Sequence, residues 1–106
     1  MSVIDASSGK PHARREQRFP IDLAAIVRGE GRDLPVRLKN LSRGGAFGEC
    51  LRPPAVASEV VLVRGALTVE ARVAWIGCCC FGLQFARQIR ATELLVQLSL
   101  SRTALA

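Results

Sequence analysis

The strongest constraint on the fold is an alternating run at residues 67–76. Apolar side chains stand at every second position of this run, and polar or small residues stand between them. Because successive side chains of a β-strand point to opposite faces, this period of two predicts a strand with one buried face. The residues that we expect to face the core are Leu67, Val69, Ala71, Val73 and Trp75.

Shorter apolar stretches, bounded by glycine, proline and polar turn residues, predict more strands at residues 21–28, 34–41, 46–50 and 59–63. A sixth strand is expected after Gly77, with an inner face formed by Cys79, Phe81, Leu83 and Phe85. Six short strands separated by turns predict an all-β domain, either a small antiparallel barrel or a sandwich. The pattern alone does not distinguish these architectures from an OB-like barrel.

After the sixth strand the hydrophobic period changes from two to that of a helix. Ala91, Leu94, Leu95 and Leu98 recur at helical spacing, which predicts a helix over residues 91–101. Thr92 is the expected N-cap, and the acidic side chain that follows it suits the first turn. We expect this helix to close one open end of the barrel and to cover apolar side chains there.

The chain has 106 residues, which is enough for one domain, and a formal net charge of +6. Nearly all of the positive charge is arginine, since the only lysines are Lys10 and Lys39. Arginine forms planar, bidentate contacts with phosphate and guanine, so an anionic partner is expected. Residues 1–13 lack periodicity and are interpreted as a flexible tail.

The four cysteines, Cys50, Cys78, Cys79 and Cys80, are interpreted as small buried hydrophobic residues in a reducing compartment. The chain has no CxxC pair, and its single histidine lies in the N-terminal tail, so no metal site is expected. It also has no apolar run long enough to span a bilayer and no signal-peptide pattern. These features predict a cytoplasmic protein.

Two polar stretches are the candidate functional elements. Arg14, Arg15 and Arg18 form an arginine arm ahead of the first strand, and residues 40–45 form a corner between two strands. Asn and Ser hydrogen-bond nearby backbone in turns, and glycine allows another group to approach the main chain. Each stretch also has a purely structural interpretation: the arginine arm as a solvated tail, and residues 40–45 as a plain turn.

The two stretches together carry an RxxxR motif and an NxSxxG motif, followed by Val73-x-Trp75 and Gly82-Leu83-x-Phe85. In this order they resemble the PilZ domain family of bacterial cyclic-di-GMP (c-di-GMP) receptors, over residues 14–85. Asn in the first place of the corner is an accepted variant of the family's Asp. The resemblance implies a six-stranded antiparallel barrel with a C-terminal α-helix. It also implies a c-di-GMP site formed by Arg14, Arg18, Asn40, Ser42 and Gly45, with Arg15 and Gly44 beside them.

We therefore expect a single domain at residues 14–103, with the arm at 14–18, the barrel at 21–86 and the helix at 91–101. Its expected function is that of a stand-alone effector that binds c-di-GMP, needs no cofactor and signals to a partner protein. Catalysis is not expected, because Ser42 has no base partner in the sequence. The alternatives are a PilZ-like adaptor that binds no nucleotide and a basic nucleic-acid-binding barrel, although aromatic residues make up only 5% of the chain.

Overall fold

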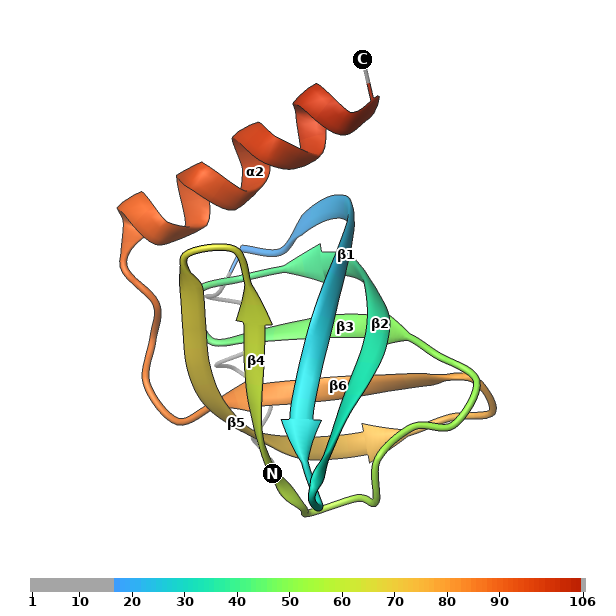
Figure 1. Ribbon diagram of the computed structural model, residues 1–106. Helices are drawn as coiled ribbons and strands as arrows, with labels where there is room; N and C mark the ends of the chain where they lie inside the picture. The colour runs from blue at the N-terminus through green and yellow to red at the C-terminus, as the bar shows by residue number, and fades with distance from the viewer. Residues whose placement is uncertain (1–16, 106) are drawn as a thin grey trace, which may run out of the picture.

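The computed structural model describes residues 17–105. The elements are β1 (Phe19–Gly29), β2 (Arg32–Leu41), β3 (Gly45–Glu49), β4 (Glu59–Arg64), β5 (Leu67–Ile76), β6 (Cys80–Phe85) and α2 (Ala91–Leu105). The strands close into a barrel in the order β1-β2-β3-β6-β5-β4, and every neighbouring pair is antiparallel (Figure 1). The barrel is confirmed over the sandwich, and so is the C-terminal helix.

The hairpin between β1 and β2 is tighter than expected. Its turn consists of Glu30 and Gly31 alone, and both have positive φ, 53° and 76°. Two-residue turns of this kind match the right-handed twist of the flanking strands. Both strands therefore extend past the predicted bounds.

The alternation in β5 places its side chains as predicted until the strand nears its end. Leu67, Val69, Ala71 and Val73 are at most 5% exposed. Trp75, which was expected to face the core, is 46% exposed, and that prediction is wrong. The pairing of β5 with β6 shifts between Val73 and Trp75, so that Val73 lies opposite Leu83 but Trp75 lies opposite Gly82. This extra residue is a β-bulge, and it turns the indole to the outer face of the barrel.

The helix α2 lies across one end of the barrel (Figure 1). It buries Leu94, and two hydrogen bonds tie it to the strands: Asp22 N donates to Ser101 Oγ (3.0 Å), and Gln97 Nε2 donates to Arg64 O (3.3 Å). Leu95 remains 62% exposed, so α2 presents part of its apolar surface to solvent.

The start of α2 differs from the expected cap. The amide of Arg90 donates to the Glu93 carboxylate at 2.7 Å, which is half of a capping box. Arg90 therefore occupies the capping position, and Thr92 lies within the first turn, because the helix begins at Ala91. The prediction of Thr92 as N-cap is wrong, whereas Glu93 does lie in the first turn.

The cysteines are also placed differently from the prediction. Cys78 and Cys79 are exposed, and Cys50 and Cys80 are half-buried. Since β6 begins at Cys80, Cys79 belongs to the turn before this strand and does not contribute to its inner face. The four thiols are therefore not the buried hydrophobic residues that the sequence suggested.

Candidate functional site

The corner between β2 and β3 is held together by Ser42. Its hydroxyl accepts hydrogen bonds from the amides of Gly44 (3.3 Å) and Gly45 (3.0 Å) and donates to the carbonyl of Gly45 (3.2 Å). The Ser42 amide also donates to the Gly45 carbonyl at 2.9 Å. Ser42 is fully buried, so its hydroxyl shapes the corner from within.

Gly45 is needed for space and not for an unusual backbone angle. The glycines with positive φ among the described residues are Gly31 and Gly65. A Cβ atom on Gly45 would overlap the carbonyl oxygen of Leu83 in the neighbouring strand β6. The close approach of β3 and β6 at this point therefore excludes a side chain.

Arg18 and Asn40 meet at the edge of this corner. Arg18 lies directly before β1, and Phe19 at the start of β1 pairs with Leu41 at the end of β2. This pairing places Arg18 Nη1 3.4 Å from Asn40 Oδ1, in an exposed hydrogen bond. The structure thus joins the second arginine of the RxxxR motif to the first residue of the NxSxxG motif. Arg14 and Arg15 lie outside the described residues.

A cavity of about 460 Å³ adjoins the corner. Arg18, Gly44 and Gly45 line one part of it, and Phe47 and Trp75 line another. The two aromatic rings are stacked, with their centroids 5.6 Å apart and their planes 25° apart. The cavity therefore combines a cation with an aromatic surface, which is a suitable combination for a nucleotide.

The aromatic surface depends on Gly82. A Cβ atom at this position would overlap Nε1 of Trp75, so the indole lies directly against the glycine backbone. The sequence pattern did not indicate Trp75 as a site residue, because the alternation of its strand placed that side chain in the core. The glycine opposite it in the late strand pair was the available signal, since glycine in a strand indicates close approach by another group.

A second arginine on the cavity wall is already paired. Arg87 lines the cavity and donates to both carboxylate oxygens of Glu93, with Nη1 at 3.1 Å and Nη2 at 3.3 Å. The hydrogen bonds from Arg87 and from the Arg90 amide lower the pKa of Glu93 to about 2. The carboxylate in turn raises the pKa of Arg87. This ion pair joins the cavity wall to the first turn of α2.

The corner is bonded directly to the segment that leads into α2. Arg43 Nε donates to Ile89 O at 2.8 Å, and Ile89 N donates to Arg43 O at 2.8 Å. Phe85 N donates to Gly44 O at 2.8 Å. Ile89 is itself fully buried in the core. A displacement of the corner would therefore be transmitted to the start of the helix.

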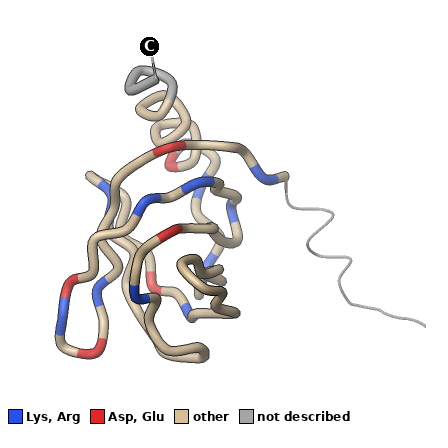
Figure 2. The backbone as a smooth tube through the Cα atoms, turned by 90° about the vertical axis from the view of Figure 1, so that its right-hand side faces the viewer, with Lys and Arg blue, Asp and Glu red and all other residues tan. Residues whose placement is uncertain are grey.

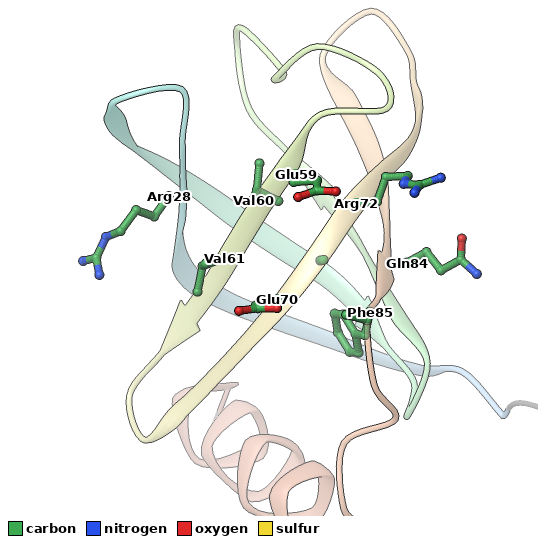
Figure 3. Close-up of a pocket in the computed structure, with 10 residues that line it drawn as sticks. Arg28, Glu59, Val60, Val61, Glu70, Arg72, Gln84 and Phe85 are labelled. Carbon is green, nitrogen blue, oxygen red and sulfur yellow. The ribbon is translucent and has the colours of Figure 1, made fainter.

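A neighbouring cavity of about 530 Å³ lies over β4 and β5 (Figure 3). Its charged residues have both signs, with Arg28 and Arg72 beside Glu59 and Glu70. Arg28 is also paired with Asp33, with Nε 2.9 Å from Oδ1. Acidic and basic positions are interspersed along the backbone of the barrel (Figure 2). This cavity thus lacks the excess of positive charge that an anionic ligand requires.

Residues 17–105 contain no group of three His, Cys, Asp or Glu side chains that could hold a metal ion. In the same residues, no helix has the length and apolar character required to cross a lipid bilayer.

The closed six-stranded barrel, with an aromatic-lined cavity beside an arginine-bearing corner, is a small all-β domain with one candidate ligand site at this corner. The family model for the PilZ domain matches residues 12–101, and the chain belongs to this family. The PilZ family is in general a family of c-di-GMP receptors, and its domains are known as binding and adaptor domains. A search among curated proteins found no match.

Proposed function

We propose that this protein binds c-di-GMP in the cavity beside the corner and acts as a non-enzymatic effector. The observation that supports this most strongly is the meeting of Arg18 and Asn40 at the rim of a cavity with a stacked aromatic pair. The ligand has two phosphates and two guanine bases. An arginine fork and an aromatic face match these two kinds of group.

In this proposal the arginines and Asn40 make the polar contacts. Arg14 and Arg18 bind phosphate oxygens or the O6 and N7 acceptors of guanine, and Arg15 contributes between them. The Asn40 amide bonds a base or phosphate edge. Within residues 17–105 the Asn40 side chain accepts a hydrogen bond from Arg18 at the long distance of 3.4 Å, so little is lost when the ligand replaces that contact.

The remaining corner residues set the shape of the site. The Gly44 and Gly45 amides both donate to the Ser42 hydroxyl, so these residues serve the ligand by fixing the corner and leaving room above it. Trp75 and Phe47 supply a stacking surface for guanine, worth about 1–3 kcal/mol per base.

Binding is then relayed through the corner to α2. Charge-assisted hydrogen bonds of about 1.5–3 kcal/mol each must exceed the conformational entropy that the contacting side chains lose when the ligand binds. The hydrogen bonds between Arg43 and Ile89 connect the ligand-bound corner to the start of α2. A partner protein would recognise the changed positions of the arm and of the helix. In this proposal the protein therefore acts as an adaptor.

The aromatic pair formed by exposed Trp75 and half-buried Phe47 also favours a second candidate function, the binding of single-stranded nucleic acid. Stacking surfaces and a net charge of +6 are the features that such proteins use. The acidic residues distributed over the barrel oppose a continuous basic track (Figure 2).

Titration calorimetry with c-di-GMP, c-di-AMP, GTP and a short oligonucleotide separates these functions. We expect c-di-GMP to bind and c-di-AMP to bind far more weakly, because guanine offers arginine two acceptors where adenine offers one acceptor and one donor. Equal heats for the two cyclic dinucleotides would contradict base recognition by arginine. Binding of the oligonucleotide alone would establish the second candidate in place of the first.

A further inference from the structure

All four cysteines of the chain gather at one end of the β3–β6 ladder. A cavity of about 560 Å³ at this end is lined by Cys50, Cys78, Cys79 and Cys80, together with Phe47, Glu49 and Leu51. The proposed ligand site does not use these thiols. Their convergence from two separate segments of the chain requires its own explanation.

Cys79 is the central member of this thiol cluster. Its Sγ lies 3.8 Å from Sγ of Cys78, and its carbonyl accepts a hydrogen bond from the Cys50 amide at 3.0 Å. The last ladder pair is Glu49 with Cys80, so Cys50 and Cys79 stand directly opposite each other one step further on. Directly opposed residues of an antiparallel pair present their side chains on the same face.

This opposition fits the geometry of a disulfide. The Cα atoms of a hydrogen-bonded antiparallel pair are about 5.5 Å apart. A disulfide requires a Cα separation of about 4.4–6.8 Å. The turn that holds Cys79 is exposed, so its thiol is accessible to small oxidants, whereas Cys50 packs against the core.

A structural metal is a poorer fit to the cluster. Zinc sites of this kind need four ligands, and the described residues contain no group of even three suitable side chains around one point. Chemistry that joins thiols in pairs needs only two sulfur atoms, and the pair formed by Cys50 and Cys79 supplies them.

We propose that the thiol cluster is an oxidation site, at which hydrogen peroxide converts Cys50 and Cys79 into an intramolecular disulfide. The Cys79 thiolate attacks the peroxide oxygen, the O–O bond breaks, and a sulfenic acid forms with release of water. Cys50 then attacks the sulfenic sulfur, the S–S bond forms, and a second water leaves. With hydrogen peroxide, two thiols and one oxidant molecule thus give one disulfide and two waters.

The surroundings of the thiols affect the rate of this reaction through the pKa of each thiol. The contact with Cys78 and the neighbouring thiols raise the pKa of Cys79, and burial raises the pKa of Cys50. Because the thiolate is the reactive form, oxidation is slower than at an activated cysteine.

The test is to treat the reduced full-length chain with hydrogen peroxide, block free thiols with iodoacetamide and digest the protein with trypsin. Cys50 lies in the tryptic peptide of residues 44–64, and the other three cysteines lie in that of residues 73–87. We expect two blocked thiols per chain instead of four, a monomer on a non-reducing gel, and a cross-linked pair of these peptides that dithiothreitol separates.

Variants identify the bonded pair. Cys50→Ser and Cys79→Ser should each abolish the cross-linked peptide pair, while Cys80→Ser, the matched control, should retain it. A disulfide confined to residues 73–87, an intermolecular disulfide, or four thiols that remain blockable after peroxide would each overturn the proposal. Formation of the cross-link to the same extent in Cys79→Ser would show that Cys79 is not its partner.

Discussion

Ser42→Ala tests whether the buried hydroxyl holds the corner between β2 and β3 together. The substitution removes the acceptor for the Gly44 and Gly45 amides, and Gly45 is buried. The carbonyl of Gly45 keeps its bond from the Ser42 amide, so the principal loss is one buried amide without a partner. Such a group costs about 1–3 kcal/mol in the free energy of unfolding.

This magnitude can be measured by chemical and thermal unfolding followed by fluorescence of Trp75, the single tryptophan. A loss of about 1–3 kcal/mol should lower the Tm by roughly 4–8 °C for each kcal/mol in a domain of this size. Ser58→Ala is the matched control, because its hydroxyl makes an exposed bond to Ala55 O. We expect that control to change stability by less than about 0.5 kcal/mol. If both variants have the same free energy of unfolding and the same Tm as the parent, the Ser42 hydroxyl does not hold the corner.

Three further variants test other parts of the account. Gly45→Val should reduce stability and c-di-GMP binding together, since a side chain there collides with the β6 backbone; unchanged melting would refute this reasoning. Trp75→Ala should weaken c-di-GMP binding by roughly tenfold to a hundredfold with little change in stability. Ile76→Ala is the control and should leave binding unchanged, because Ile76 is equally exposed but lies outside the cavity. The pKa of Glu93, about 2 in the fold against an ordinary 4.5, means that its ionised form stabilises the protein fully above pH 4.5 and progressively less as the pH falls toward 2. Glu93→Gln should therefore flatten the acid side of the stability profile measured by urea unfolding, and an unaltered profile would count against the ion pair.

Local patterns were sufficient to predict most of the barrel. The strand at Leu67–Ile76 has the bounds that its alternation predicted, and the other strands differ by a few residues. The choice of a barrel over a sandwich came from the family resemblance, because both architectures place the same alternate side chains inside. The closed hydrogen-bonded strand order confirms it.

The errors have a common physical origin in long-range pairing. The bulge that exposes Trp75 depends on the register between β5 and β6, which the sequence of β5 alone does not specify. The exposure of Cys79 depends in the same way on where β6 begins. An alternation rule applied within one strand detects neither effect.

The candidate site was predictable as a pair of motifs but not as a geometry. The sequence indicated Arg18 and Asn40, and the structure places them in contact across 22 residues of chain. The link between Arg43 and Ile89 had no local signal, because one of its bonds joins two backbone groups and the other joins the Arg43 side chain to a backbone carbonyl 46 residues away. The hydrogen bonds that the Ser42 hydroxyl makes within the corner were also not predictable, since the sequence does not distinguish a buried serine from an exposed one.

The most direct test of the central claim is titration calorimetry of c-di-GMP against Arg18→Ala and Arg52→Ala. Both variants lose one exposed arginine and the same charge, but only Arg18 lies at the cavity. We predict that Arg18→Ala raises the Kd at least tenfold, consistent with the loss of about 1.5–3 kcal/mol in a charge-assisted contact, while Arg52→Ala binds as the parent does. Equal binding by Arg18→Ala and the parent would contradict the claim that the arginine and the corner together form a c-di-GMP site.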